Sequence, residues 1–312
     1  MYFGTDYYPE HWTKQRWGID AKLMKEAGIN LVRLGEFAWA KLEPIEGQWD
    51  FTWLDEAVDI FYKEGIKVVI GTPTATPPKW LVDKYPKICK EDENGLIQGF
   101  GSRRHYCYNS DVYSRYTEKI VNKMAQRYGG NPKIAAWQID NEFTCGDGLY
   151  CYCEECREKF IAWLKNKYKS LDALNIAWGT VFWSQTYTDW KQIIVPKKAQ
   201  ASFKGNNGHN PGMNLDYSRF QSDAIVSYCA VQKETIKKWS NLPVTHNMVE
   251  NLYDYYKLGK EIDFVSYDNY PSTQWQHLRK GRNYDPAFAI DLERGVKNQN
   301  IWIMEEQSGP CG

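Results

Sequence analysis

The feature that most restricts the fold of this sequence is a repeated alternation of short β-rich runs with amphipathic helical stretches. Helices between the strands predict parallel pairing, because a parallel connection needs a crossover long enough to hold a helix. Several helical stretches end in patterns such as KEAGIN and KEGIKV, in which a glycine follows the last turn. Seven runs are predicted as strands, near residues 2–6, 30–34, 67–71, 134–139, 243–248, 262–267 and 301–305.

Strands this short in a parallel α/β arrangement predict closure into a (β/α)8 TIM barrel. A doubly wound open sheet is the alternative, but no glycine-rich phosphate turn follows the first run. Seven strands are one fewer than a closed barrel needs, so we expect the eighth βα unit to be missing from this chain. We therefore predict one TIM-barrel domain over residues 1–312, incomplete at its C-terminus, with residues 170–215 as an elaboration over the barrel top.

Composition narrows the range of partners and the cellular location. Lys plus Arg and Asp plus Glu both number 39, so no net charge attracts nucleic acid or an anionic membrane. The 14 Trp and 22 Tyr side chains suit the apolar faces of sugar rings, although such residues also fill cores. No apolar run reaches the ~20 residues of a membrane span. The first residues lack a signal-peptide pattern, and this start and the clustered cysteines together favour a reducing cytoplasm.

Two glutamates at predicted strand ends suggest the chemistry. Glu142 follows the fourth strand and Glu305 ends the seventh, so both are expected at the C-terminal mouth where these barrels place active sites. A pair of carboxylates across a pocket suits glycoside hydrolysis, in which one protonates the leaving oxygen and the other attacks the anomeric carbon. Asn141 could donate to a sugar 2-hydroxyl. Strand alternation turns only one of Glu305 and Glu306 inward, without deciding which.

A second group of residues is typical of a metal site. Three cysteines lie within six residues shortly after Glu142: Cys151, Cys153 and Cys156. Structural zinc takes four tetrahedral ligands, so a fourth must come from elsewhere, and Cys107, Cys145 and His105 are candidates. Four thiolates leave no open position for water, so the metal would brace the loop and take no part in catalysis.

Long motifs also carry a family resemblance. The sequence resembles glycoside hydrolase family 42, the β-galactosidases with a catalytic TIM barrel, over essentially its whole length. The resemblance rests on FGTDYYPEHW, VRLGEFAWAKLEPIEG, WQIDNEF, LNIAWGTVFWSQTY, SYDNYP and IMEEQSGP. It implies a retaining double displacement on terminal β-D-galactosides, with Glu142 as acid/base and Glu305 as nucleophile. Where the family often carries Gln, this chain has Glu306. Carboxyl groups about 5–5.5 Å apart and a protonated Glu142 are expected.

The resemblance implies further site residues and partners. Arg33 resembles a substrate-site arginine that would hydrogen-bond the nucleophile and keep it ionised, and Tyr270 resembles a pocket tyrosine, with Tyr267 as its rival. Cys107 matches the family's fourth ligand and would complete a structural Zn²⁺ site, and no organic cofactor is expected. The expected partner is a β-galactoside oligosaccharide. The family's further sugar contacts, and the regions through which members often form trimers, lie beyond this chain, so a homotrimer would need them.

Three other functions fit parts of the same pattern. A β-glycosidase for another sugar (arabinopyranoside, glucoside or xyloside) keeps the barrel and the carboxylate pair. A non-catalytic carbohydrate-binding barrel would use the aromatic residues without turnover. A zinc-dependent hydrolase or redox protein would use the Cys-x-x-Cys of residues 153–156, but no thioredoxin-like context surrounds it.

Overall fold

The computed structural model describes residues 1–145, 150–198, 208–249, 253–270 and 286–307. Its strands pair in parallel in two sheets, with the orders β1-β2-β3-β4-β5 and β6-β7-β8. Only His246 separates β5 from β6, so the two sheets continue one another along a single predicted run. The strands are β1 (Gly4–Asp6), β2 (Leu31–Leu34), β3 (Lys67–Gly71), β4 (Ile134–Gln138), β5 (Val244–Thr245), β6 (Asn247–Met248), β7 (Ser266–Asn269) and β8 (Trp302–Glu306).

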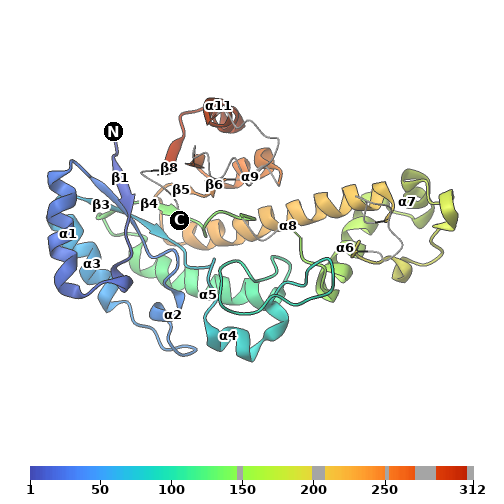
Figure 1. The fold of residues 1–312 in the computed structure, drawn as a ribbon, viewed down its shortest axis with the longest axis horizontal. Coiled ribbons are helices and arrows are strands. Elements are labelled where there is room, and N and C mark those ends of the chain that lie inside the picture. Colours follow the sequence, from blue (N-terminus) through green and yellow to red (C-terminus); the bar gives the residue numbers. More distant parts are fainter. Residues whose placement is uncertain (146–149, 199–207, 250–252, 271–285, 308–312) are drawn as a thin grey trace.

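Helices follow the strands in the order expected for βα units (Figure 1). Short 3-10 turns interrupt the connections at Pro9–His11, Pro86–Ile88, Phe182–Ser184 and Trp190–Gln192. The helices are α1 (Lys14–Glu26), α2 (Trp39–Leu42), α3 (Thr52–Lys63), α4 (Lys79–Lys84), α5 (Asp111–Tyr128), α6 (Glu154–Tyr168), α7 (Leu171–Trp178), α8 (Pro211–Lys237), α9 (Tyr255–Glu261) and α11 (Pro286–Lys297).

The helix boundaries have local causes. The Ser110 side chain accepts a hydrogen bond from the Tyr113 amide and begins α5, and Asn210 caps α8 in the same way ahead of Pro211. Just after α1 and α3, Gly28 and Gly65 take φ angles of +81° and +83°, a backbone conformation that favours glycine. The glycine-ended helices predicted from the sequence are therefore confirmed.

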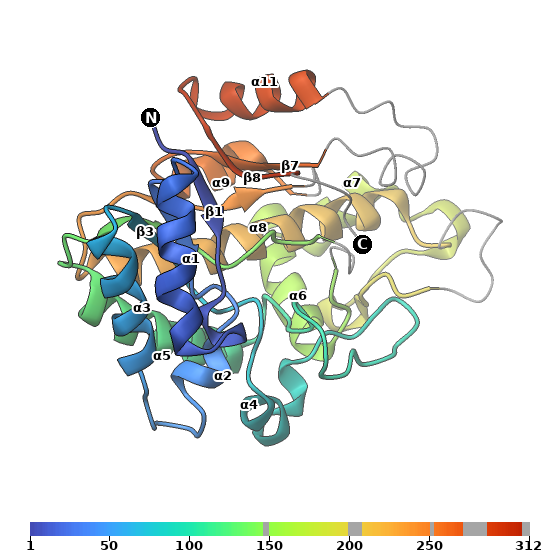
Figure 2. The same cartoon turned by 60° about the vertical axis from the view of Figure 1, so that its left-hand side comes forward.

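The packing is that of a barrel wall. Helix α1 packs on α3, α5 on α8, α8 on α9, and α9 on α11, so the helices follow one another around the outside of the sheet (Figure 2). The main core fills the space between strands and helices, with the large side chains of Trp39, Phe61, Trp137 and Tyr113 fully buried. Among the described helices, none combines the length and hydropathy of a membrane span.

The described strands leave the sheet open between β1 and β8. No ladder joins these two strands within the described residues, and the Tyr2 and Trp302 rings lie 5.2 Å apart across the opening. A hollow of about 450 Å³ lies there, lined by residues of both strands and by Arg33. The (β/α)8 prediction is confirmed for the fold class, with seven strand positions described and the eighth not among them.

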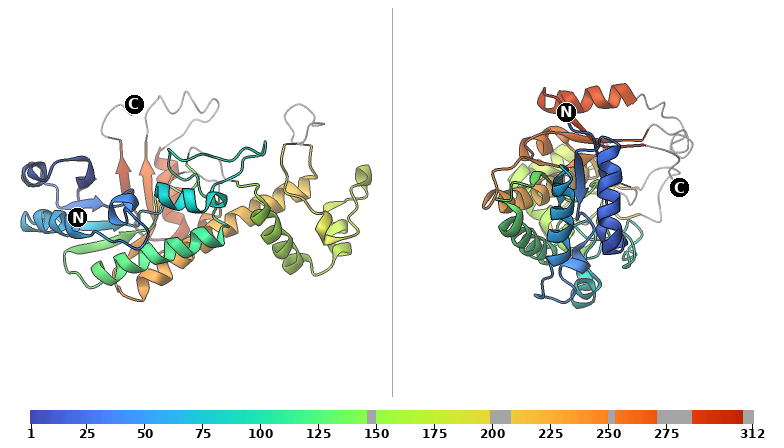
Figure 3. Two further views of the ribbon diagram at one scale, coloured as in Figure 1. Left: turned by 90° about the horizontal axis from the view of Figure 1, so that it is seen from below. Right: turned by 90° about the vertical axis from the view of Figure 1, so that its left-hand side faces the viewer.

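An arm extends from the barrel. Helices α6 and α7 and the first half of α8 project to one side of the sheet (Figures 1 and 3). They enclose a second core, in which Phe160, Leu164, Trp178 and Tyr217 are buried. The helical spacing of Phe160, Trp163, Leu164 and Tyr168 predicts a helix over 154–168, and α6 confirms it. The domain limits, and the suggestion that residues 170–215 cover the barrel top, stay predictions.

One strand lies later than its predicted range. The run near 262–267 predicted a strand from its apolar residues, whereas β7 spans Ser266–Asn269. Ile262 and Val265 are buried ahead of the strand, so the apolar signal marks the approach to it. The strand itself ends in Asp268 and Asn269, which are buried polar residues at the barrel mouth.

Candidate active site

The loop after β4 holds Glu142 in a strained backbone. Asp140 and Glu142 have φ angles of +52° and +45°, a left-handed region that costs a non-glycine residue about 1–3 kcal/mol. Contacts from other strands hold this shape. Asn247 Oδ1 accepts from the Glu142 amide at 3.0 Å, and His246 Nε2 accepts from the Phe143 amide at 3.2 Å. Burial lowers the pKa of His246 to about 3, so its ring stays neutral and able to accept.

The Glu142 carboxyl is buried next to positive charge. Its Oε2 lies 2.9 Å from Arg103 Nη2 and 3.5 Å from Arg104 Nη1, and Asn141 Nδ2 donates to it at 3.1 Å. Burial, and then the charge of Glu305, raises the pKa of Glu142 above its ordinary value, and the arginines oppose only part of this rise. The group is therefore suited to carry a proton.

Glu305 lies opposite, in a different environment. Arg33 Nη2 donates to Glu305 Oε1 at 2.6 Å, and the Tyr270 hydroxyl donates to Oε2 at 2.5 Å. Arg33 is 4% exposed and is fixed by two further contacts, to Glu36 Oε1 at 2.8 Å and Gln138 Oε1 at 3.0 Å. The guanidinium and the hydroxyl donor together hold both oxygens of Glu305 in place, as the position of a nucleophile requires.

The two candidate catalytic groups are close. A carboxylate oxygen of Glu142 and one of Glu305 lie within 4.8 Å of each other, and an oxygen of Asp268 lies within the same distance of both. Retaining glycosidases keep their carboxyl groups about 5–5.5 Å apart, whereas inverting enzymes need about 6.5–9.5 Å to admit a water. An oxygen–oxygen separation of less than 4.8 Å favours the shorter arrangement.

A bulge in β8 decides which glutamate points inward. Tyr267 pairs with Ile303, but Asp268 pairs with Glu305, so Met304 is an extra residue and the register shifts there. The shift brings Glu305 to the inner face with Arg33. Glu306 points away and accepts from Asn269 Nδ2 at 2.9 Å, as expected for alternate sides. Tyr267, the rival of Tyr270, packs in the main core.

The predicted cysteines also come together. One sulfur from each of four cysteines lies within 4.8 Å of the others: Cys107, Cys151, Cys153 and Cys156. Cys107 Sγ lies 3.3 Å from Cys156 Sγ and 3.9 Å from Cys153 Sγ. Zinc held by four thiolates at about 2.3 Å sets its sulfurs about 3.8 Å apart, so this donor set fits a tetrahedral soft ion. Cys145 and His105 lie outside the group, and His105 Nδ1 contacts the Ser102 carbonyl at 3.0 Å.

Backbone and side-chain donors point at the sulfurs. The Glu91 amide donates to Cys151 Sγ and Asn109 Nδ2 donates to Cys156 Sγ, both at 3.4 Å. Such donors stabilise thiolates and orient metal ligands. The cluster joins the loop that follows β3 to the chain that follows Glu142, and α6 begins directly after Cys153.

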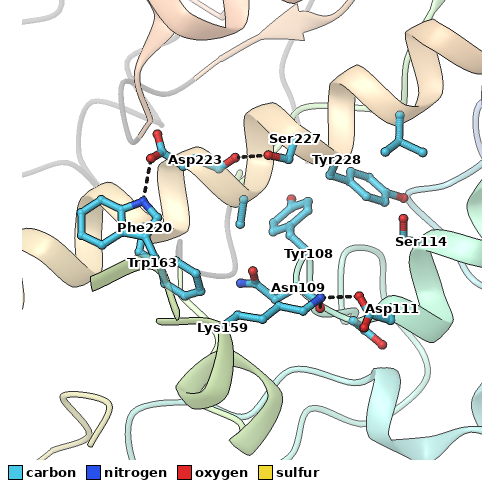
Figure 4. Close-up of a pocket in the computed structure, with 13 residues that line it drawn as sticks. Tyr108, Asn109, Asp111, Ser114, Lys159, Trp163, Phe220, Asp223, Ser227 and Tyr228 are labelled. Carbon is cyan, nitrogen blue, oxygen red and sulfur yellow. Dashed lines mark hydrogen bonds and ion pairs between the residues drawn. The ribbon is translucent and has the colours of Figure 1, made fainter. Parts of the chain in front are cut away.

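A hollow of about 310 Å³ lies next to this cluster, between α5, α6 and α8 (Figure 4). Its polar groups already bind one another. Trp163 Nε1 donates to Asp223 Oδ2 at 2.9 Å, and Lys159 forms an ion pair with Asp111. Asn109 lines the hollow and also reaches Cys156, so the hollow borders the cysteine cluster and lies apart from the carboxylates.

Comparison with known proteins identifies the family of this chain. The sequence model of the glycoside hydrolase 42 family, described as beta-galactosidase, matches residues 6–312. The chain belongs to this family. A beta-galactosidase, BgaA, of Clostridium cellulovorans is 47% identical over 100% of the chain and 46% of its own length. A beta-galactosidase of Thermus thermophilus is 44% identical over 98% of the chain and 49% of its own length. The family 42 chain described here thus spans about half the length of these relatives.

Solved structures agree with the family and the fold. The crystal structure of a beta-galactosidase from the psychrophilic Marinomonas ef1 superposes with a TM-score of 0.92 at 41% identity, covering 99% of this chain and 49% of that one. The catalytic domain of a beta-amylase from Paenibacillus polymyxa superposes with a TM-score of 0.71 at 16% identity, which shows a shared fold alone. The family 42 assignment therefore confirms the TIM-barrel class.

Some residues of this family 42 site were missed in the sequence analysis. Arg103 and Arg104 sit in a loop with no periodic pattern, and their only signal was a pair of adjacent arginines before HYCYNS. Asn247 lies in the last two residues of the predicted run 243–248, and Asp268 directly follows the run 262–267. The rule that placed Glu142 at the barrel mouth could therefore have found them.

Proposed function

We propose that this protein is a retaining glycoside hydrolase that cleaves terminal β-D-galactosides. The observation that carries the proposal is that two carboxyl groups with different surroundings lie close together. Oxygens of Glu142 and Glu305 lie within 4.8 Å, one carboxyl having a raised pKa and the other held by Arg33 and Tyr270. Membership of the family, and the beta-galactosidases of Clostridium cellulovorans and Thermus thermophilus among its members, support a β-galactoside as the substrate class.

The reaction is a double displacement. Glu305 attacks the anomeric carbon while Glu142 gives its proton to the departing glycosidic oxygen, which forms a covalent galactosyl ester on Glu305. A water then enters, Glu142 takes its proton, and the oxygen attacks the same carbon to release galactose with its β configuration. Burial and the charge of Glu305 supply the raised pKa that the first step requires of Glu142.

Neighbouring groups assist each step. Arg33 balances the negative charge of Glu305 and sets the direction of its carboxylate, and Tyr270 holds the other oxygen. Asn141 Nδ2 donates to Glu142 Oε2, so its amide lies beside the acid, and we assign it to the sugar 2-hydroxyl. A contact to that hydroxyl strengthens in the transition state.

We infer a structural zinc at the four cysteines: Cys107, Cys151, Cys153 and Cys156. With four thiolates, the ion would have no open position and would supply folding energy only. Its role is to fasten the loop after β3 to the chain after Glu142. A cytoplasmic location and a homotrimer stay predictions.

Stereochemistry and trapping test the proposed function together. With a nitrophenyl β-D-galactoside, proton NMR at early times should show β-galactose as the first product. A 2-deoxy-2-fluoro-galactoside with a good leaving group should add one sugar to Glu305, seen by peptide mass spectrometry. First appearance of α-galactose, or a label on another residue, would contradict the double displacement. A panel of nitrophenyl arabinopyranosides, glucosides and xylosides tests the choice of sugar, because the highest kcat/KM should fall on the galactoside.

A further inference from the structure

The pocket contains a third carboxyl group that the proposed reaction does not use. Asp268, at the mouth end of β7, is 1% exposed, and one of its oxygens lies within 4.8 Å of oxygens of both Glu142 and Glu305. Like charges at this distance strongly disfavour full ionisation of the set. How the three groups share their protons therefore determines how the pocket works.

Asp268 lacks the full set of partners that a buried carboxylate ordinarily has. Its Oδ2 accepts from Asn247 Nδ2 at 2.6 Å, whereas its Oδ1 is buried and has no hydrogen-bond partner among the described residues. No ion pair in the described part of the chain includes Asp268, because Arg33 directs its guanidinium to Glu305 and Glu36. A buried carboxylate ordinarily collects donors or a cation at both oxygens. With one donor, no cation among the described residues and two further carboxyls close by, the charged form of Asp268 is disfavoured relative to the protonated form.

Asn247 connects Asp268 to both catalytic candidates. The side-chain nitrogen of Asn247 also reaches Asn141 Oδ1 at 2.9 Å and Glu305 Oε1 at 3.4 Å, and its oxygen accepts from the Glu142 amide at 3.0 Å. The acceptor on Asp268 sets the direction of this amide, because it makes the shortest of these contacts.

We propose that Asp268 is a positioning residue that works as a neutral acid: it orients Asn247 without adding a charge to the pocket. This inference rests on the proposed function. An ionised Asp268 would keep the Asn247 contact, but it would place a second negative charge against Glu305 and would bind the Glu142 proton more tightly. The neutral form leaves one carboxylate to attack and one acid to donate.

Four charged or titratable groups interact with Asp268, each from a different segment of the chain. They are Arg33 on β2, Glu142 after β4, Glu305 on β8 and Tyr270 after β7. Burial, and then the charges of Glu305 and Glu142, raises the pKa of Asp268 well above its ordinary value, while Arg33 and the Asn247 hydrogen bond oppose the rise.

Two substitutions separate orientation from charge. Asp268→Ala removes the acceptor, so kcat/KM should fall about 100-fold through misplacement of Asn247. Asp268→Asn keeps an acceptor oxygen and zero charge, so it should recover kcat/KM to within about tenfold of the wild-type value. Melting temperatures and near-ultraviolet circular dichroism of both variants establish that they fold.

The pH profile of kcat/KM gives a readout that a purely structural role would not move. With Asp268 neutral in the wild type, the alkaline limb of Asp268→Asn should lie within about half a pH unit of the wild-type limb. If Asp268 were ionised, its removal would lower the pKa of Glu142 and move that limb to lower pH by about one unit or more. Such a shift, or an Asn variant as slow as the Ala variant, would overturn the proposal.

Infrared difference spectroscopy tests whether the Asp268 carboxyl is protonated, without measuring turnover. At neutral pH, the wild type minus Asp268→Asn should show the C=O band of one protonated carboxyl. The same subtraction with Asp291→Asn should show none, because the Asp291 side chain is 70% exposed. Absence of the Asp268 band would overturn the proposal. Absence of galactoside hydrolysis by the wild type would instead count against the proposed function, so the two failures are distinguishable.

Discussion

The carboxylate pocket and the cysteine cluster each crowd acidic side chains within 4.8 Å, but they differ in how their members are surrounded. Glu142 is buried and its pKa is raised, whereas Glu305 faces Arg33 and Tyr270. The four cysteines, in contrast, offer four ligand atoms of one kind, with one sulfur of each within 4.8 Å of the others. Carboxyl groups with unlike surroundings can divide the roles of acid and nucleophile, whereas four thiolates suit a single shared ion.

The largest effect should come from the nucleophile. Glu305→Gln removes the attacking oxygen, so kcat on a nitrophenyl β-D-galactoside should fall by about 10⁴-fold or more, with the melting temperature nearly unchanged. Glu306→Gln is the matched control, since this neighbour points to the other side of β8 and binds Asn269. A loss for Glu306→Gln equal to that for Glu305→Gln would break the distinction between the two residues.

Substitution of the proposed acid, Glu142, should have the second-largest effect on activity. It should also change the pH profile. Glu142→Gln should lower kcat by about 10²–10⁴-fold on substrates with poor leaving groups, and by less where the leaving group needs no proton. The raised pKa means that wild-type activity is present below it and is lost as pH rises through it. Stopped assays across pH should therefore find this alkaline limb missing in Glu142→Gln; a variant that retained the limb would exclude Glu142 as the acid.

The charge opposite the nucleophile should matter less than either carboxyl. Arg33→Gln leaves Glu305 without its cation at 2.6 Å, and kcat/KM should fall by about 100-fold. Arg33→Lys should recover little of this loss, because one ammonium cannot also reach Glu36 and Gln138. Initial rates on the same galactoside measure the effect, and near-normal rates for Arg33→Gln would contradict the assigned role.

A substitution in the cysteine cluster should change the stability of the protein more than its turnover, the opposite of a substitution in the carboxylate pocket. Cys153→Ser should abolish stoichiometric zinc and lower the melting temperature by roughly 5–10 °C, since loss of a clamp of a few kcal/mol moves a domain of this size by that amount. Below the melting transition, kcat should change by less than about tenfold. Metal analysis and thermal unfolding provide the measurements.

Cys145→Ser is the control for that experiment, because this buried cysteine lies outside the cluster. It should retain one zinc per chain. If Cys153→Ser kept its zinc, or if its turnover fell as far as that of Glu142→Gln, the separation between a bracing region and a reacting region would fail.

Patterns of neighbouring residues in the sequence predicted much of the fold and part of the candidate site. Short apolar runs separated by glycine-ended helices predicted the strands, because each signal lies within a few residues of the element it marks. The position of Glu142 after β4 and the spacing of Cys151, Cys153 and Cys156 are likewise local. The shifted start of β7 shows the limit of such patterns, because its strand residues are polar.

The sequence by itself therefore determined the order of strands and helices, the candidate acid and three of the four cysteines. Only the tertiary structure decided that a bulge at Met304 turns Glu305 inward, and that Arg33, 272 residues earlier, meets it. It also decided that Asn247 and Asp268 join the pocket. The reason is physical. Strand register and burial depend on contacts between segments that are distant in the sequence, and such contacts produce no periodic pattern of residue types.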